Sequence, residues 1–361
     1  MKTHSKSIVR ILVINPGSTS TKVAVYDNTR CLFTETVSHS EDELSVFKQI
    51  IDQKTFRFQL VGQILKKHKI NTESIHAVVG RGGLLRPLEG GTYTVNSAML
   101  SDLSSEKYGT HPCNLGGLIA YELGKAGNIP AYIVDPVVVD EMEPVFRLTG
   151  IPEIERKSIF HALNQKAVAR YIAAETGKKY ENTNLIVAHM GGGISVALHR
   201  NGRVVDVNNA LNGEGPMAPE RAGTIPAGQL VDLCFSKKYS YREMHRKLVG
   251  GAGLVAYIGS NDLRNLMDMI DKGNQKAAML FQGMAVQISK SIASLAPAVK
   301  GNVDAIILTG GLAKDDRFAG LIKSRVEWIA PVYVKPGEME MEALAYGALR
   351  ILLKEEESKE Y

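Results

Sequence analysis

Short apolar runs that end in polar turns recur along this chain, and two of them share one layout. In the first, Val9–Ile14 leads into the turn Asn15–Thr21, and an apolar strand pattern resumes over Lys22–Tyr26. A β-branched run that is interrupted by Pro, Gly and Ser and then resumes predicts a hairpin of two strands. The turn offers backbone N–H groups, hydroxyls and the Lys22 charge to an anion, although a polar surface turn would explain the same residues.

The second copy begins at residue 184. The apolar run Asn184–His189 leads into Met190–Ser195, which carries three consecutive glycines, and a strand pattern follows that turns at Asn201-Gly202. Asn-Gly between two strand patterns is a strong hairpin signal. Asp27-Asn28 occupies the corresponding place in the first copy. Two copies of one supersecondary unit predict a duplicated domain, with two polar turns facing a cleft between the halves.

The remaining pattern alternates strands and helices. Strands are expected at 75–80, 131–134, 304–308 and 332–334, and helices at 41–69, 115–125, 157–172, 276–298 and from 338 onward. This order predicts a mixed sheet with helices on its faces. Open α/β sheets bind ligands at the carboxyl ends of their strands, where this chain places Arg81, Asp135 and the pair Gly310-Gly311. The long irregular segment 208–226 contains Arg221, and such segments in compact domains are usually functional.

Composition narrows the function classes. The chain has 361 residues, with 44% hydrophobic and 22% charged positions, which is typical of a soluble globular protein of two domains. A net charge of +5 without a basic block gives little support to nucleic-acid binding. The three cysteines form no CxxC pair, which argues against a zinc site and fits the reducing cytoplasm. The N-terminal apolar run is too short for a signal peptide or a membrane span.

With these motifs in order, the chain resembles the acetate and butyrate kinases of the actin, sugar-kinase and heat-shock-chaperone ATPase superfamily, over essentially its whole length. The segment Asn15–Lys22 is similar to the family's first phosphate loop, 189–193 to its second, and Thr309–Gly311 to its adenosine motif. The resemblance implies a duplicated ribonuclease H-like fold with an interdomain cleft. One domain would comprise residues 1–157 and 343–361, and the nucleotide-binding domain residues 158–342.

The resemblance also implies roles for single residues. Around the transferred phosphoryl group it places Arg81, His161 and Arg221. ATP phosphates and adenosine would contact Asn15, Ser18, Ser20, Lys22, His189, Gly191, Gly192, Gly193, Gly310 and Gly311. Mg²⁺ would be held near Asn15 by Asp135 and Glu342, with Glu340 as the competing glutamate, and His111 would lie near the substrate.

The implied reaction is the reversible, ATP-dependent phosphorylation of a short-chain fatty acid, and a homo-oligomer is implied as well. Acetate kinases typically carry two valines after the substrate-site arginine, whereas Arg81 is followed by Gly82-Gly83. Room for two more carbons would favour butyrate by about 1.6 kcal/mol, or roughly tenfold. Acetate or propionate kinase is the first alternative. A hydroxyl-directed kinase using Asp135 as general base is the second, and an ATP-gated chaperone or filament protein is the third.

Overall fold

The computed structural model describes residues 8–361 and divides the chain into two units. Unit 1 consists of Met1–Val139 and Met339–Tyr361, and unit 2 of Asp140–Glu338. Residues 1–7, with which the expected first domain begins, lie outside the described residues. None of the described helices is both long enough and apolar enough to cross a membrane.

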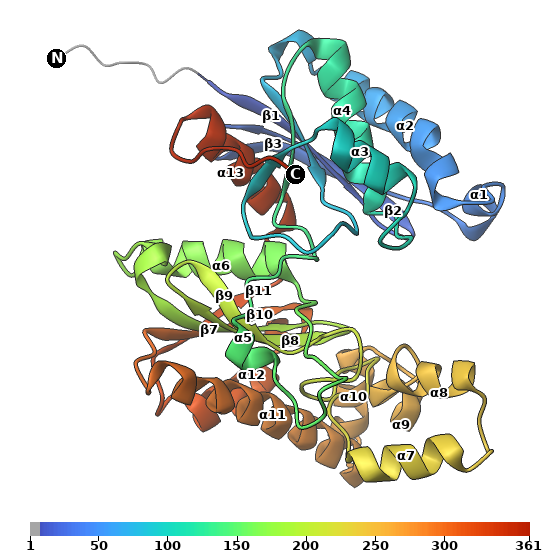
Figure 1. Ribbon diagram of the computed structural model, residues 1–361, viewed down its shortest axis with the longest axis vertical. Helices are drawn as coiled ribbons and strands as arrows, with labels where there is room; N and C mark the ends of the chain where they lie inside the picture. The colour runs from blue at the N-terminus through green and yellow to red at the C-terminus, as the bar shows by residue number, and fades with distance from the viewer. Residues whose placement is uncertain (1–7) are drawn as a thin grey trace. The chain divides into compact units, whose positions relative to one another are not determined.

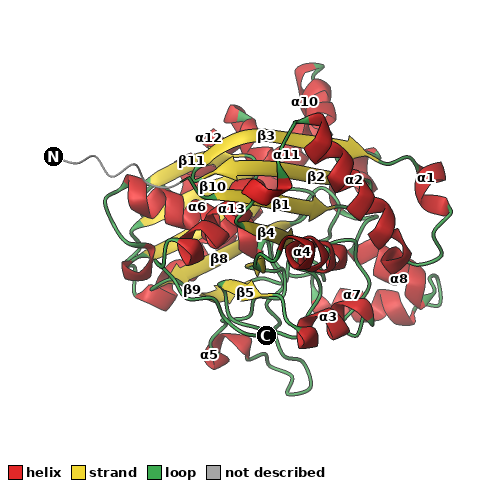
Figure 2. Ribbon diagram, turned by 90° about the horizontal axis from the view of Figure 1, so that it is seen from above, coloured by secondary structure: helices red, strands yellow, loops and turns green. Residues whose placement is uncertain are grey.

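Unit 1 contains a mixed sheet with strand order β3-β2-β1-β4-β6-β5. Its strands are β1 (Arg10–Pro16), β2 (Ser20–Asp27), β3 (Arg30–Ser38), β4 (Ala77–Arg81), β5 (Thr92–Thr94) and β6 (Ala131–Val134). Strand β2 is antiparallel to both β1 and β3, strands β1, β4 and β6 run parallel, and β5 is antiparallel to β6. Strands β3, β2, β1 and β4 lie side by side in Figure 2.

Successive side chains of β1 point to opposite faces of the unit 1 sheet, and those from Ile11 to Pro16 are buried, so both faces of the sheet are covered. Leu12 and Ile14 belong to a core shared with residues of helices α2 (Lys54–Lys67), α3 (Ser97–Ser104) and α4 (Asn114–Gly127). Helix α13 (Glu340–Leu352), which also packs on the sheet, lies on the opposite side (Figure 1). The C-terminal helix therefore completes the unit in which the chain began.

The unit 2 sheet, with strand order β11-β10-β7-β8-β9, repeats the arrangement of β6, β4, β1, β2 and β3 and lacks an equivalent of β5 among the described residues. The strands are β7 (Asn184–Met190), β8 (Ile194–Arg200), β9 (Arg203–Val207), β10 (Ala305–Gly310) and β11 (Val332–Pro336). Strand β8 is antiparallel to both β7 and β9, while β10 and β11 run parallel to β7, as β4 and β6 run parallel to β1 in unit 1. A register irregularity falls at Val25/Tyr26 in one hairpin and at Leu198/His199 in the other. The duplication predicted from the two hairpins is therefore present.

Helices cover both faces of the unit 2 sheet, with α6 (Ala162–Glu175) on one face and α11 (Gln275–Leu295) and α12 (Asp316–Val326) on the other (Figure 1). The remaining helices of the described chain are α1 (Glu41–Ser45) in unit 1, and α5 (Pro144–Arg147), α7 (Ala227–Phe235), α8 (Tyr241–Leu248), α9 (Gly253–Ile258) and α10 (Leu263–Asp271) in unit 2. The segment 208–226 contains no named helix or strand, as its composition predicted.

The unit boundary lies after Val139, whereas the sequence suggested residue 157. Residues 140–157 belong to unit 2 because their charged side chains bind there. Glu141 forms a buried ion pair with Lys166 at 2.9 Å and accepts the backbone N–H of Val204 at 2.7 Å. Arg156 pairs with Asp206 at 2.9 Å. The return to unit 1 likewise precedes residue 343, since Glu340 bonds to unit 1 residues described below.

The two glycines after β4 pack tightly against neighbouring side chains. A Cβ at Gly82 would lie 2.5 Å from Pro136 Cβ, and one at Gly83 would lie 2.6 Å from Asn114 Cα and 2.8 Å from Leu103 Cδ2. The interpretation that these glycines leave room for a longer acyl tail is therefore wrong. The protein itself fills the space that side chains there would occupy.

We expect Gly83→Val to destabilise the protein by about 1 to 3 kcal/mol, because the added methyl groups overpack a filled site. Gly62→Val on α2 is the matched control, since nothing lies within 4 Å of a Cβ at Gly62. Urea unfolding of both variants measures the difference. Equal stability of Gly83→Val and wild type would show that Asn114 and Leu103 can move aside, and would restore the pocket interpretation.

His199 on β8 is fully buried beneath α6 in unit 2. Its Nδ1 lies 2.8 Å from the hydroxyl of Tyr180, and its Nε2 lies 3.0 Å from Oε1 of Gln165. Because the amide oxygen can only accept, the neutral ring donates from Nε2 and accepts the Tyr180 hydroxyl at Nδ1. Burial, together with the charges of Lys166 and Arg170, holds the pKa of His199 well below 6.5.

This burial makes stability depend on pH. Below about pH 6.5 the unfolded chain binds a proton at this histidine that the folded chain does not. As the pH is lowered from 6.5, the free energy of unfolding therefore falls by about 1.4 kcal/mol per pH unit, until the pKa of the folded state is reached. We expect His199→Gln to reduce the change of unfolding free energy with pH by the amount due to one proton, about 1.4 kcal/mol per pH unit, as measured by urea unfolding between pH 6.5 and 5. Exposed His245→Gln is the control. An identical slope in wild type and His199→Gln would contradict the assignment.

Candidate phosphate and acid sites in the two units

A cluster of charged side chains lies at the carboxyl edge of the unit 1 sheet. Asn15 and Arg81 lie at the ends of the paired strands β1 and β4. Both bind Glu340 at the start of α13: Asn15 Nδ2 donates to Oε2 at 2.8 Å, and the Arg81 guanidinium forms an ion pair with Oε1. The structure therefore brings together three residues that were expected to act at one site.

The charges in this cluster act on one another. Burial raises the pKa of Glu340, but the charge and hydrogen bond of Arg81, the hydrogen bond from Asn15 and the charge of Lys22 together hold it below its ordinary value. Glu340 is therefore an anion at neutral pH, and it balances the charge of Arg81.

Glu342 does not belong to this cluster. Burial, followed by the negative charge of Glu342, raises the pKa of Tyr26 and of Tyr346. Tyr26 pairs with Ile11 on β1, four residues before Asn15. Of the two competing glutamates, Glu340 is the one that contacts Asn15 and Arg81, because a helical step of two residues turns a side chain to another face.

Asp135 follows β6, which pairs with β4 on the side away from β1. It is buried, its backbone has a positive φ of 37°, and it exchanges two hydrogen bonds with Gly91: the Gly91 N–H donates to Oδ1 at 2.7 Å, and the Asp135 N–H donates to the Gly91 carbonyl at 3.0 Å. These bonds fix the carboxylate at the same edge of the sheet as Asn15 and Arg81.

The donor set limits how a metal ion could be held. Among residues 8–361, no three His, Cys, Asp or Glu side chains gather closely enough to hold an ion by themselves. Mg²⁺ that arrives with a nucleotide takes one or two carboxylates, and phosphates and water fill the other positions. Asp135 fits that requirement. Glu340 fits it less well, because both of its oxygens are engaged by Asn15 and Arg81.

His111 lies in the loop before α4, within the electrostatic reach of Arg81. Burial and the charge of Arg81 lower the pKa of His111. Its Nδ1 accepts the backbone N–H of Cys113 at 3.2 Å and lies 2.9 Å from the Cys113 sulfur. The neutral ring therefore carries its proton on Nε2. Burial raises the pKa of the Cys113 thiol to about 11, which makes this cysteine unreactive at neutral pH.

The second cluster lies in unit 2, on the face of the sheet that α6 covers. The rings of His161, which immediately precedes α6, and His189, on β7, stack with centroids 3.9 Å apart and planes inclined by 11°. Asn164 Nδ2 lies 2.8 Å from Nδ1 of His189 and 3.3 Å from Oγ1 of Thr309 on β10. The carboxyl ends of β7 and β10 are therefore joined through one α6 side chain.

A chain of hydrogen bonds orients the His161 ring. Gln165 Nε2 donates to the Ser195 hydroxyl oxygen at 2.7 Å, and that oxygen lies 2.8 Å from Nδ1 of His161. The Ser195 hydroxyl can donate its own proton to Nδ1 or accept a second hydrogen bond from it, so this contact fixes the orientation of the His161 ring for either tautomer. The neutral ring of His189 carries its proton on Nε2, because the Asn164 amide donates to its Nδ1.

The glycine loop after β7 lies against Arg221. A side chain at Gly193 would collide with the guanidinium of Arg221, which also donates to the carbonyl of Ala210. Burial lowers the pKa of Arg221, and the charge of Glu220 partly opposes this effect. The guanidinium still stays charged at neutral pH, because arginine ordinarily titrates far above it. The structure thus places a cation against the predicted second phosphate loop.

The glycine pair at the end of β10 has two different environments. Gly310 has φ 89°, and a Cβ there would lie 2.7 Å from the backbone nitrogen of Met190, whereas Gly311 faces open space. Gly310 also exchanges backbone hydrogen bonds with Gly337 at 3.0 and 2.9 Å. Gly310 therefore allows β7 and β10 to approach closely, and Gly311 is the one that could lie beside a ligand.

Sequence reasoning missed several residues that the structure brings to these clusters. Asn164, Gln165 and Ser195 orient the two histidines, and Asn114 bonds both Leu84 N–H and the Gly109 carbonyl. Ser195 and His199 could have been found, because polar residues at alternate positions of an otherwise apolar strand share one buried face. The role of Gln165 depends on how α6 packs and leaves no signal of that kind.

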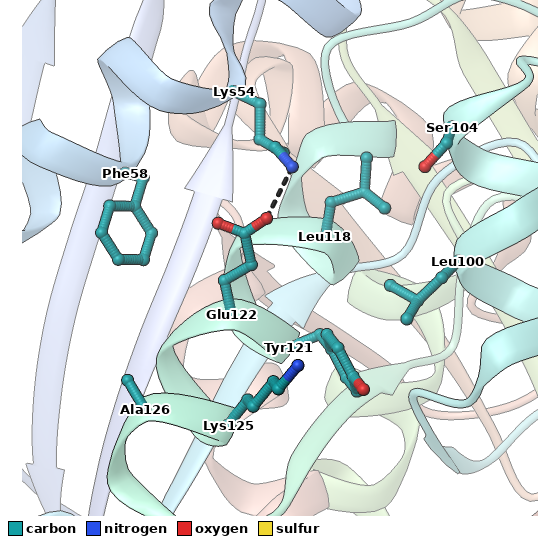
Figure 3. Close-up of a pocket in the computed structure, with 9 residues that line it drawn as sticks. All are labelled: Lys54, Phe58, Leu100, Ser104, Leu118, Tyr121, Glu122, Lys125 and Ala126. Atoms are coloured by element: carbon teal, nitrogen blue, oxygen red, sulfur yellow. Dashed lines mark hydrogen bonds and ion pairs between the residues drawn. The ribbon is translucent and has the colours of Figure 1, made fainter.

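An open groove of about 650 Å³ lies elsewhere on unit 1 and contains none of the predicted site residues. Figure 3 shows its lining, in which Lys54 and Glu122 form an ion pair at 2.5 Å beside Phe58 and Tyr121. The groove lies among α2, α3 and α4, and the charged cluster lies at the strand ends.

Comparison with known proteins agrees with this description. Residues 153–322, slightly less than half of the chain, match the Acetokinase family. The fold is similar to that of Porphyromonas gingivalis acetate kinase at a TM-score of 0.75 and 20% identity, covering 96% of this chain and 100% of that one. The fold is also similar to that of a propionate kinase from Francisella tularensis subsp. tularensis SCHU S4, at a TM-score of 0.71 and 18% identity, covering 94% of this chain and 99% of that one. Acetate kinase from Entamoeba histolytica matches at a TM-score of 0.71 and 17% identity, covering 94% of this chain and 98% of that one.

These matches confirm the predicted fold class, a duplicated actin-like ATPase fold with two mixed sheets. Most of unit 2 matches the Acetokinase family by sequence, and the whole chain has the fold of the acetate and propionate kinases.

Proposed function

We propose that this protein is an acyl kinase of the acetokinase family, which transfers the γ-phosphoryl group of ATP to a short-chain carboxylic acid. The observation that carries the proposal is the unit 1 cluster, in which Arg81 at the end of β4 lies beside Asn15 of the predicted phosphate loop. The family match over residues 153–322 supports the same conclusion from the other unit.

The chemistry requires cations more than it requires a base. A short carboxylic acid titrates at about 4 to 5, so it is already a nucleophilic anion at neutral pH. Its carboxylate oxygen forms a bond to the γ-phosphorus as the bond to ADP breaks, which yields an acyl phosphate. The protein must overcome the repulsion between the two anions and stabilise the charge on the phosphoryl group in flight.

We assign these tasks to the residues of each unit. Arg81 binds the acid, while Asn15 and Lys22 face phosphate at the first loop. In unit 2, Arg221, His161 and the Nε2–H group of His189 face phosphate at the glycine loop. Asp135 would hold Mg²⁺, whose charge would offset that of the phosphates when it is bound.

Glu340 neutralises Arg81, and this has a consequence for binding. An incoming carboxylate must share the guanidinium with Glu340 or displace it. The planar guanidinium has five N–H donors and can serve two carboxylates at once. We therefore infer that Glu340 holds Arg81 in position for the acid.

The preferred acid is proposed from the sequence alone. The pattern Arg81-Gly82-Gly83 resembles that of butyrate kinases, so we propose butyrate ahead of acetate and propionate. The packing around Gly82 and Gly83 supplies no reason for this preference. The expected homo-oligomer and cytoplasmic location remain proposals of the same kind.

The function is tested by incubating the protein with ATP, Mg²⁺, hydroxylamine and a panel of acids from acetate to valerate. We expect acyl hydroxamate to form, with the highest kcat/KM for butyrate. Glycerol and glucose serve as hydroxyl acceptors in parallel. ADP release with a sugar and no hydroxamate with any acid would favour the hydroxyl-directed kinase, in which Asp135 would act as base.

The two glutamates at the start of α13 give a second test. We expect Glu340→Gln to lower kcat/KM for the acid by roughly a hundredfold, because Arg81 loses the charge that positions it. Glu342→Gln on the same helix is the matched control and should change kcat/KM less than about threefold. A larger loss of kcat/KM in Glu342→Gln than in Glu340→Gln would show that Glu342 is the glutamate of the site.

A further inference from the structure

Arg57 on α2 is the largest of the fully buried side chains in the described chain, with 0% of its surface exposed. Its Nε and one terminal nitrogen both donate to Gln53 Oε1, at 3.1 and 2.9 Å. The other terminal nitrogen donates to the Ser20 carbonyl at 2.9 Å and to the Thr21 hydroxyl oxygen at 3.0 Å. The guanidinium is therefore well supplied with hydrogen bonds.

All of these partners are neutral. No Asp or Glu among residues 8–361 forms an ion pair with Arg57, and burial is the only influence on its pKa, which it lowers to about 10. Arg57 is still protonated at neutral pH. Its charge also helps burial to lower the pKa of His39, whose Nε2 lies 2.8 Å from the Thr21 hydroxyl.

A buried charge without a counter-charge is unusual. Removing an ion from water costs several kcal/mol, and proteins normally recover this cost by pairing the ion. Retaining such a charge in a core is explained if a charge of opposite sign arrives from outside the protein.

The position of Arg57 indicates where that charge would lie. Ser20 and Thr21 begin β2 and belong to the last part of the predicted first phosphate loop, Asn15–Lys22. The Ser20 carbonyl that binds Arg57 also accepts the N–H of Gly17 at 2.8 Å, and the Thr19 carbonyl accepts the N–H of His39 at 2.8 Å. Arg57 thus supports the end of this loop from the interior of unit 1.

We propose that Arg57 is a positioning residue that fixes the first phosphate loop and supplies it with buried positive charge, which a phosphate group of the bound nucleotide balances. This inference rests on the proposed function, since it assigns the anion to ATP. A purely structural role, in which Arg57 only donates hydrogen bonds to Ser20 and Thr21, is the alternative to be excluded.

Gln53→Glu separates the two roles. The substitution keeps the shape of the side chain and an oxygen for both donors of Arg57, but it gives the guanidinium a carboxylate partner inside the protein. We expect the Kd for ATP in the presence of Mg²⁺ to rise on the order of tenfold, because a unit charge is neutralised behind the loop. Thermal stability should be unchanged or higher.

Gln63→Glu, exposed on α2, the helix that carries Arg57, is the control that changes the net charge equally. It should leave the Kd for ATP within about twofold of wild type, since exposed charges are screened. Arg57→Lys should bind ATP more tightly than Arg57→Met, because it keeps the charge. Binding is measured by titration calorimetry and folding by circular dichroism.

An unchanged Kd for ATP in Gln53→Glu would overturn the inference and leave Arg57 with a structural role. A wild-type protein that binds no ATP would instead overturn the proposed function. The two failures are distinct, because the first requires ATP binding by the wild type. If Arg57→Met does not fold, Gln53→Glu still decides the question.

Discussion

The structure depends on how polar groups are satisfied where buried parallel strands end. Strands β1, β4 and β6 in unit 1, and β7 and β10 in unit 2, are apolar along their length and reach polar loops at their carboxyl ends. Helix side chains hold four of these ends: Glu340 of α13 binds Asn15 and Arg81, and Asn164 of α6 bonds His189 and Thr309. The end of β6 is held by the hydrogen bonds between Asp135 and Gly91. Without these side chains, buried polar groups at the strand ends would lose hydrogen-bond partners, which is costly.

This constraint also explains why the charged residues are positioned for chemistry. Arg81 is held by the Glu340 carboxylate, which balances its charge, whereas Arg57 is held by neutral acceptors only. In unit 2, Asn164 bonds directly to His189, and Gln165 bonds to the Ser195 hydroxyl that contacts His161, so both stacked imidazoles are fixed in orientation. Fixed donors of this kind stabilise charge without having to reorganise during reaction.

Gly82 and Gly83 show how a local pattern can suggest the wrong cause. From the sequence, two glycines beside Arg81 indicate missing side chains and therefore space. In the structure, Pro136 and the residues Asn114 and Leu103 already occupy that space. Small residues permit the close approach of neighbouring segments as readily as they open a pocket, and the sequence does not distinguish these outcomes.

The sequence by itself determined the two hairpins, the parallel strands after them and the loops at their ends, because strand period and turn chemistry are local properties. Arg81, Asp135 and His189 could be placed at strand ends for that reason. Only the tertiary structure decided that Glu340 meets Arg81 across 259 residues, that residues 140–157 join unit 2, and that Arg57 lies behind the first loop. Such contacts depend on the rotation and depth at which a helix packs on a sheet, and one residue of helical register turns a side chain by about 100°.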